Sequence, residues 1–236
     1  MKNIAVILAG GIGKRMGDVN LPKQFLEIGG IPIIILTLKN FINSKLFHKI
    51  YIAINPDWEE YLQELLFNYN LNFEFIIMVN GGKERNDSIE NSLDLIKENE
   101  NIKDDDIIVI HDAVRPFITT KLLTDAINET QKFGATVAIT PVKDTMILSE
   151  KGIAVSMPDR TKLFHSQAPD SFKFSIIYDA LKSLTEDERK FITGTSQICA
   201  SKNIHVHTFL GDERNIKITT IMDLFLANAI YKEMFS

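Results

Sequence analysis

Short apolar runs alternate along the chain with longer segments in which apolar residues recur at helical spacing. The runs are rich in β-branched residues and too short for helices. They predict strands buried on both faces, at Ile4–Leu8, Lys49–Ile54, Phe73–Val79, Ile107–Ile110 and Thr136–Ile139. The helical spacing predicts helices over Ile33–Phe41, Trp58–Phe67, Ser88–Ile96 and Leu122–Phe133. This alternation predicts an α/β fold, with an open, mostly parallel sheet and helices on both faces.

The pattern changes after Pro141, where residues 142–164 mix β-forming residues with polar and turn residues. Glu150-Lys151-Gly152 separates two short alternating runs, which predicts a projecting hairpin arm. An isolated hairpin buries too little apolar surface to be stable alone. We therefore expect the arm to pack against a second subunit, in preference to folding back on its own domain. A homodimer follows as a hypothesis.

The C-terminal part is expected to add three elements, a helix near Phe174–Ser183, a strand near His205–Leu210 and a last helix from about Thr220 to Phe235. Thr220 and Asp223 have the spacing of a pair that caps the start of a helix. No internal repeat or low-complexity linker interrupts the chain. We therefore expect one domain over residues 1–236, a length at which a single core is common.

The composition excludes several classes of function. With a net charge of −5 and no run of Lys or Arg, the chain lacks the clustered positive charge that a nucleic acid requires. No apolar stretch approaches the roughly 20 residues that span a bilayer. The lone Cys199 excludes an intramolecular disulfide and is expected to be a buried core residue. We expect a cytoplasmic protein with neither a membrane nor a nucleic acid as partner.

A glycine-rich loop, Leu8-Ala9-Gly10-Gly11-Ile12-Gly13, directly follows the first predicted strand. Glycines there allow backbone N–H groups to approach a phosphate closely. The loop is not a Walker A sequence, because Arg15 stands where Ser or Thr would bind the metal. It is a poor dinucleotide fingerprint, because Met16 stands where a third Gly or Ala belongs. A phosphate-binding loop is our main hypothesis, and a tight turn or a nicotinamide site are the alternatives.

Two of the cations that follow this loop are candidates to bind phosphate. Lys23 comes directly after Pro22, which holds the preceding residue extended and restricts the approach of the chain. Arg15 and Lys23 are therefore candidates to converge on one triphosphate. Positive charge around the α and β phosphates would neutralise the charge that develops during phosphoryl transfer. The alternative for Lys23 is a solvated surface residue.

A third polar segment, residues 81–88 (GGKERNDS), follows the predicted strand Phe73–Val79 and begins a helix. Its glycine backbone and the helix N-terminus are expected at the same end of the sheet as the first loop. The side chains of Arg85, Asn86 and Ser88 are candidates to bond a base or ribose. Ser88 is equally suited to cap its own helix.

A fourth segment, His111-Asp112-Ala113-Val114-Arg115, follows the strand Ile107–Ile110, at the edge where open α/β sheets bind ligands. Asp112 is a hard oxygen ligand suited to Mg²⁺ shared with substrate phosphates, and its alternative is a turn or helix cap. His111 is expected to be a core or loop residue. A phosphate monoester is already anionic near neutral pH, so it needs no general base.

Together these segments resemble one family over essentially the whole chain. The resemblance is carried by LAGGIGKRM, LPKQF, GGKERNDS, HDAVRPF, Val142-Lys143-Asp144-Thr145 and Asn215-Ile216-Lys217-Ile218-Thr219-Thr220. In this order they resemble the cytidylyltransferases of methylerythritol phosphate and ribitol 5-phosphate. The resemblance implies CTP as co-substrate and Mg²⁺ as cofactor. It also implies a Rossmann-like domain whose arm completes the active site of the partner in a homodimer.

The resemblance implies roles for individual residues. The CTP-binding residues would be Leu8, Ala9, Gly10, Gly11, Gly13, Gly81, Gly82, Arg85, Asn86 and Ser88. The catalytic cations would be Arg15, Lys23, Arg160 and Lys217, and the Mg²⁺ ligand would be Asp112. The acceptor would be bound by Arg115, Thr145, Arg160, Thr193 and Lys217. In the implied reaction an acceptor phosphate oxygen attacks the α-phosphorus of CTP in line with departing pyrophosphate, without a covalent enzyme intermediate.

The choice of acceptor depends on finer details. The Asn20-Leu21 insertion, Asn86, and Pro158 before Asp159-Arg160 resemble the ribitol branch. We therefore expect D-ribitol 5-phosphate as acceptor and CDP-ribitol, a precursor for teichoic acid or capsule, as product. The alternatives are 2-C-methyl-D-erythritol 4-phosphate of isoprenoid biosynthesis or another polyol phosphate.

Two departures from the family pattern lie beside the expected acceptor site. Ala168-Pro169-Asp170 replaces the usual Thr-Pro-Gln, and Thr193-Gly194 replaces Thr-Asp. The loss of hydroxyl and carboxylate groups would alter which acceptor hydroxyls are recognised. These departures also keep open a catalytically silent nucleotide-binding module.

Overall fold

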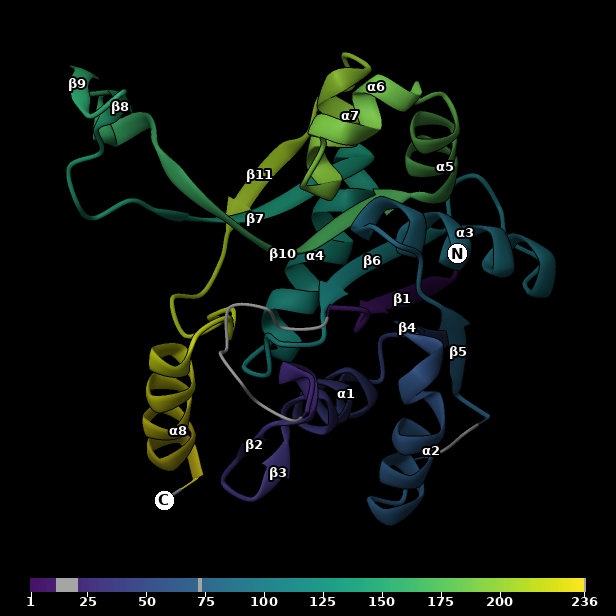
Figure 1. Ribbon diagram of the computed structural model, residues 1–236. Helices are drawn as coiled ribbons and strands as arrows, with labels where there is room; N and C mark the ends of the chain where they lie inside the picture. Colours follow the sequence, from purple (N-terminus) through teal and green to yellow (C-terminus); the bar gives the residue numbers. More distant parts are fainter. Residues whose placement is uncertain (12–20, 72–73, 236) are drawn as a thin grey trace.

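A mixed sheet forms the centre of the protein (Figure 1). The computed structural model describes residues 1–11, 21–71 and 74–235. Its seven described central strands are β1 (Asn3–Leu8), β4 (Lys49–Ile54), β5 (Ile76–Asn80), β6 (Ile107–Asp112), β7 (Ala135–Pro141), β10 (Phe164–Lys173) and β11 (His207–Leu210). They lie in the order β11-β7-β10-β6-β1-β4-β5. Neighbours are parallel except at β10, which is antiparallel to β6 and β7, so the expectation of a mostly parallel sheet is confirmed.

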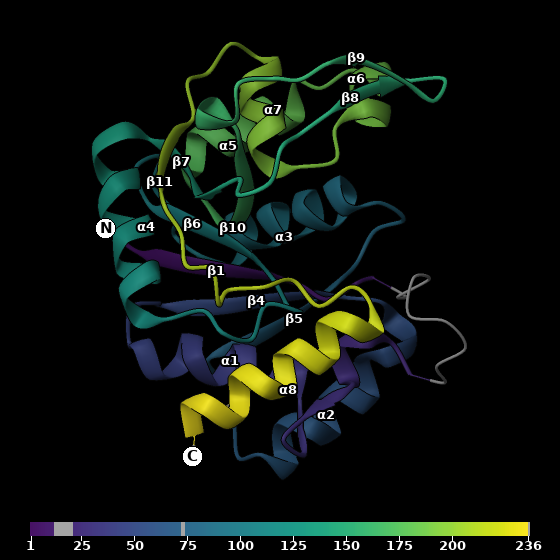
Figure 2. The ribbon, with the colours of Figure 1, turned by 90° about the vertical axis from the view of Figure 1, so that its left-hand side faces the viewer.

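Helices cover both faces of this sheet. One face carries α1 (Ile33–Ser44), α2 (Glu59–Asn68) and α4 (Thr120–Phe133). The other carries α3 (Arg85–Asn99), α5 (Phe174–Lys182) and α7 (Thr195–Ser201). Figure 2 shows α1 and α2 on one side of the strands and α3, α5 and α7 on the other.

The two-sided packing follows from the strand sequences. Successive side chains of a strand point to opposite faces, and in β1 both sets are apolar. Ala5 and Ile7 pack into the cluster with α1, α2 and α4, whereas Ile4 and Val6 pack into the cluster with α3, α5 and α7. Cys199 of α7 is fully buried in the second cluster, as expected.

The last helix, α8 (Ile221–Phe235), packs on a small hairpin formed by β2 (Glu27–Ile28) and β3 (Ile31–Pro32). Thr220 accepts a hydrogen bond at its hydroxyl from the Asp223 amide at 3.2 Å, and Asp223 accepts one from the Thr220 amide at 2.8 Å. This reciprocal pair confirms the predicted start of the helix. At Gly29 (φ +58°), an added Cβ would lie 2.2 Å from the Tyr231 ring, so a glycine is required for α8 to approach the hairpin.

The predicted arm is present and projects from the sheet (Figure 1). It contains β8 (Leu148–Glu150), β9 (Ile153–Ser156) and a short 3₁₀ helix, η4 (Arg160–Lys162). Several large apolar side chains of the arm are exposed to solvent, namely Met146, Ile147, Leu148, Ile153, Val155 and Met157. A packing role for the arm in a dimer stays a prediction.

Several elements are not anticipated from the pattern, among them β10, α6 (Glu186–Phe191) and α7. β10 contains Pro169 and the buried polar residues Gln167 and Asp170, so its sequence lacks the apolar run of a central strand. The short helices α6 and α7 carry too few turns to show a clear period. Within the described ranges, no helix combines the length and apolar character needed to cross a membrane.

Candidate active site

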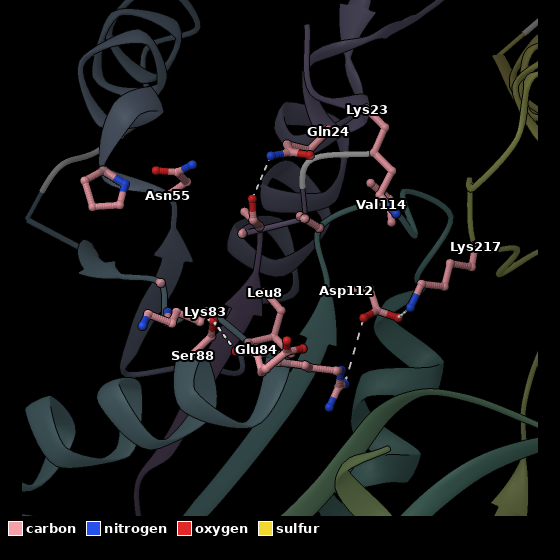
Figure 3. Close-up of a pocket in the computed structure, with 18 residues that line it drawn as sticks. Leu8, Lys23, Gln24, Asn55, Lys83, Glu84, Ser88, Asp112, Val114 and Lys217 are labelled. Carbon is pink, nitrogen blue, oxygen red and sulfur yellow. Dashed lines mark hydrogen bonds and ion pairs between the residues drawn. The ribbon is translucent and has the colours of Figure 1, made fainter. Parts of the chain in front are cut away.

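A cavity of about 630 Å³ lies at the carboxyl ends of β1, β4, β5 and β6. Among the described residues, it is lined by residues 8–11 of the glycine-rich loop, Lys23 and Gln24, Asn55 and Pro56, residues 81–85 with Ser88, residues 112–114, and Lys217. Figure 3 shows Asp112 and Lys217 pointing toward one another on one side of it, with Asn55 on the opposite side. The sheet edge predicted to bind a ligand therefore carries the cavity.

Residues 8–11 of the glycine-rich loop belong to the first wall. The Ala9 amide donates to the carbonyl of Ala53 at 2.8 Å. Gln24 is buried and donates from Nε2 to the Ala9 carbonyl at 2.6 Å. Lys23 begins the short 3₁₀ helix η2 (Lys23–Phe25) and its Cε lies 3.7 Å from where a Cβ on Gly11 would be. Leu8, Ala9, Gly10, Gly11 and Lys23 thus share one wall, while the predictions for Gly13 and Arg15 lie outside the described residues.

Residues 81–88 form the facing wall. The Gly81 amide donates to the Ile54 carbonyl at 2.7 Å, which ties this loop to β4. A Cβ on Gly82 would lie 2.1 Å from Cβ of Asp87 and 3.0 Å from its backbone, so a larger residue does not fit. Ser88 accepts from the Gly82 amide at 3.0 Å and donates to the Glu84 carbonyl at 3.2 Å. Its hydroxyl therefore shapes the loop, in addition to lining the cavity.

Asp112, the last residue of β6, is the electrostatic centre of the site. Its Oδ2 lies 3.0 Å from Lys217 Nζ and 3.2 Å from Arg115 Nε, and its Oδ1 lies 3.9 Å from Arg85 Nη2. Burial disfavours the charged carboxylate, but Lys217, Arg85 and Arg115 outweigh that effect. They hold the pKa of Asp112 well below its ordinary value, so the group is anionic at neutral pH.

A second buried carboxylate lies on the far side of Arg85. Asp170 of β10 has its Oδ2 3.9 Å from Arg85 Nη2, and Arg85 Nη1 donates to the hydroxyl of Thr195 at the start of α7. Burial raises the pKa of Asp170 to about 6, and the negative charge of Asp112 adds to this, whereas Arg85 opposes it. The sequence marks Asp170 as a departure from the usual Thr-Pro-Gln of the family but does not indicate its role.

The donor set at Asp112 fits a magnesium ion bound together with substrate phosphates. Lys217 and Arg115 lie closest to Oδ2, whereas Oδ1 lies 3.9 Å from Arg85 Nη2, which is too far for a direct hydrogen bond with this guanidinium. In the part of the chain that the structure describes, no group of three or more acidic, His or Cys side chains surrounds a common point. Mg²⁺ commonly takes one or two carboxylates and completes its shell with water and phosphate oxygens.

The remaining predicted residues divide into two groups. Arg115 does not line the cavity. Its Nη1 donates to the Asn215 backbone carbonyl at 2.8 Å, which links the segment after β6 to the segment that carries Lys217. Asn86 is buried, and its side-chain amide donates to the Ile192 backbone carbonyl at 3.0 Å. It therefore bonds the segment before α7 and does not line the cavity. Their assigned ligand contacts stay predictions.

The other group lies away from the cavity of its own chain. Arg160 is exposed on the arm and donates to the Lys143 carbonyl at 2.7 Å, and Thr145 is exposed at the base of the arm. Thr193 is exposed and its hydroxyl donates to Gln197 at 3.2 Å. None of these lines the described cavity, and their roles at an acceptor site stay predictions.

The sequence analysis gives no role to several residues that line the cavity, among them Asn55, Pro56 and Gln24. Asn55 and Pro56 directly follow β4, and the signal that could have found them is their position after a predicted parallel strand. Gln24 belongs to the LPKQF segment, from which only Lys23 is assigned a role.

His111 is fully buried and its Nε2 lies 3.1 Å from the Arg115 backbone carbonyl. Burial lowers the pKa of His111 to about 4. Of the two expectations, a core or a loop residue, the first is confirmed.

The buried Asp170 predicts a specific pH dependence of stability. Its pKa is about 6 in the folded protein and 3.8 ordinarily, so the folded state binds this proton more tightly. As pH rises from about 4 to 6, the unfolded chain releases the proton first and stability falls, by on the order of 3 kcal/mol from this group. Asp170→Asn should therefore gain stability relative to the wild type across that window, measured by urea unfolding at each pH. A difference between the two proteins that does not change with pH would contradict this.

The fold and sequence are similar to those of characterised enzymes. The model of the IspD family, described as 2-C-methyl-D-erythritol 4-phosphate cytidylyltransferase, matches residues 3–233. The Francisella tularensis 2-C-methyl-D-erythritol 4-phosphate cytidylyltransferase is 27% identical, covers 97% of this chain and 99% of its own, and has a TM-score of 0.81. The Anaerococcus prevotii 4-diphosphocytidyl-2C-methyl-D-erythritol synthase is 26% identical, with coverages of 98% and 96% and a TM-score of 0.80.

The structure from Thermus thermophilus, at 22% identity, coverages of 96% and 98% and a TM-score of 0.73, shares the fold. A transferase family that matches nearly the whole chain leaves the nicotinamide and catalytically silent alternatives without support. The chain belongs to the IspD family and is a CTP-dependent cytidylyltransferase.

Proposed function

We propose that the chain transfers CMP from CTP to 2-C-methyl-D-erythritol 4-phosphate and releases pyrophosphate. The observation that carries the proposal is the arrangement of charge in the cavity, where Asp112 and Lys217 form one side and Lys23 lies at the glycine-rich loop. The acceptor is the one named by the matching family and by the relatives that are 26% and 27% identical. This replaces ribitol 5-phosphate, our expectation from the sequence, as the leading acceptor.

The proposed mechanism assigns the groups of the cavity to one in-line displacement. Backbone amides of the glycine-rich loop and of residues 81–83 bind the nucleotide, with Lys23 beside its phosphates. Lys217 orients the acceptor phosphate so that one of its oxygens attacks the α-phosphorus while the bond to pyrophosphate breaks. Asp112 would hold Mg²⁺, which supplies charge neutralisation to the phosphates when bound. Arg15 is proposed to act with Lys23 on the leaving pyrophosphate.

A second acceptor remains supported by particular residues. The Asn20-Leu21 insertion, Asn86 and Pro158 resemble the ribitol 5-phosphate branch of these enzymes. Asn86 is buried beside the segment that leads to Thr193, so it acts on the region where acceptor specificity is expected. D-ribitol 5-phosphate is therefore the competitor that the first assay must include.

The arm is proposed to complete the active site of a second copy. Arg160 is exposed on the arm and contacts its own Lys143, outside the cavity of its own chain. The apolar side chains of the arm are exposed as well, and an exposed apolar hairpin is typical of an interface. We infer a homodimer in which Arg160 of one copy joins Lys217 of the other around the acceptor.

The acceptor is tested by measuring pyrophosphate release from CTP and Mg²⁺ with the two polyol phosphates in separate, otherwise identical reactions. We expect kcat/KM for 2-C-methyl-D-erythritol 4-phosphate to exceed that for D-ribitol 5-phosphate by at least about tenfold, because a site that bonds particular hydroxyls rejects analogues that misplace them. The reverse ranking would make the chain a ribitol 5-phosphate cytidylyltransferase. Turnover of neither would refute both acceptors.

Lys23→Ala should lower kcat by roughly 100-fold or more, because loss of one group that stabilises developing charge has effects of this size. The matched control is Lys121→Ala on α4, since the Lys121 side chain is 84% exposed and pairs with Asp125. Both proteins should have the unfolding midpoint of the wild type. A Lys23 variant with near wild-type kcat would remove this residue from the proposed mechanism.

Mixed dimers test whether the arm acts in the partner. Arg160→Ala and Lys217→Ala proteins should each be inactive alone. After unfolding and refolding together in equal amounts, about one quarter of wild-type activity should return, because half the dimers are mixed and each holds one intact site. If Arg160 served its own chain, no mixed dimer would contain an intact site and activity would stay absent. A monomer by light scattering would also reject the arrangement.

A further inference from the structure

Arg85 joins three elements that are distant in the sequence. It is the first residue of α3, and its guanidinium reaches Asp112 at the end of β6, Asp170 on β10 and Thr195 at the start of α7. Its Nη2 lies 3.9 Å from one oxygen of each carboxylate. Arg85 is therefore shared between two buried acids rather than committed to one.

The two acids do not depend on Arg85 equally. Asp112 has closer cations, Lys217 at 3.0 Å and Arg115 at 3.2 Å. Among the described residues, Arg85 is the one cation within ion-pair distance of Asp170, whose Oδ1 is buried without a hydrogen-bond partner. The hydroxyls of Thr195 and Ser196 stabilise the Asp170 carboxylate but carry no charge. A buried carboxylate requires a counter-charge, so Asp170 attracts Arg85 more strongly than its distance alone indicates.

The position of Arg85 determines whether Asp112 can accept another ligand. Both closer cations contact Oδ2, and Oδ1 faces Arg85 across 3.9 Å. That separation is longer than the roughly 2.7–2.9 Å of a direct charge-assisted hydrogen bond, so Arg85 does not bond Oδ1 directly. If the charge of Asp170 were removed, the attraction that holds Arg85 away would disappear. The guanidinium would then close on Oδ1, because Asp112 would be its remaining carboxylate among the described residues.

We propose that Asp170 is a positioning residue that keeps Arg85 off Oδ1 of Asp112 and so leaves this oxygen available to the divalent cation that accompanies CTP. The inference rests on the proposed metal role of Asp112. It does not depend on the acceptor. Asp170 does not itself line the cavity, and it acts through the guanidinium of Arg85.

The test measures binding of Mn²⁺, a spectroscopic substitute for Mg²⁺, to the full-length protein in the presence of CTP and without acceptor, by electron paramagnetic resonance. Asp170→Asn should raise the Mn²⁺ dissociation constant about tenfold, because a charge-assisted hydrogen bond between Arg85 and Asp112 must first be broken. Ser171→Ala is the matched control. Ser171 is the next residue of β10, and its buried hydroxyl has no hydrogen-bond partner among the described residues, so this change should leave the dissociation constant unaltered.

The mechanism is isolated by adding Arg85→Gln. In this background Asp170→Asn should have no further effect on Mn²⁺ binding, since the group that would block Oδ1 is gone. Two outcomes would overturn this inference and leave the proposed function standing. One is a tenfold rise in the Mn²⁺ dissociation constant on Asp170→Asn that persists in the Arg85→Gln background. The other is an Asp170→Asn protein that binds Mn²⁺ as tightly as the wild type. Unfolding curves of all four variants identify any loss of folding, and a defect confined to partly unfolded variants would overturn it as well. Absence of CTP-dependent Mn²⁺ binding in the wild type would reject both this inference and the proposed function.

Discussion

The active site is organised around the charge of one carboxylate buried at the end of a central strand. Asp112 is charged in spite of its burial because cations reach it from three parts of the chain. Arg85 comes from the start of α3, Arg115 from the loop after β6, and Lys217 from the segment before α8. The site therefore forms only after the sheet, the helices on one face and the C-terminal segment have come together. The nucleotide loops surround a centre in which three cations face two buried carboxylates.

The buried ionic groups around Asp112 fix the geometry of the site more than they stabilise the folded protein. Desolvating two charges costs free energy that their attraction only partly returns, so buried ion pairs add little net stability. The apolar clusters on the two faces of the sheet supply the stabilisation instead. The polar groups add hydrogen bonds of defined orientation, which fix the positions of the side chains in the site. Asn215 illustrates this, because its side-chain amide donates to the Ala168 backbone carbonyl at 2.7 Å while its backbone carbonyl accepts from Arg115. The acid, its cation and β10 are thereby held in one geometry.

Much of this arrangement could be predicted from the sequence. Apolar runs and helical spacing located β1, β4, β6, β7 and the helices between them, since burial on both faces leaves a clear signal. The same signal placed Asp112 and the glycine loops at one sheet edge, and Lys23 was found from its position shortly after the first of these loops. It failed at β10, where the central strand contains polar residues that serve the site. It also could not indicate that Arg85 and Asp170 meet, because these residues are far apart in the sequence and their contact depends on the insertion of β10 beside β6.

The arm is continuous with the sheet. β7 runs outward and β10 returns, with Phe164 paired to Pro141 and His165 to Thr140, and the Val142 amide then donates to the Leu163 carbonyl at 3.2 Å. Beyond the pairing of Gln167 with Ala138, across a bulge, β10 is paired with β6 at Asp170 and Ile110. The strand that carries the acid beside Arg85 thus begins where the arm ends. In the proposed dimer, the segment that would contact the second copy is therefore adjacent along the chain to the strand that holds Asp170 beside Arg85.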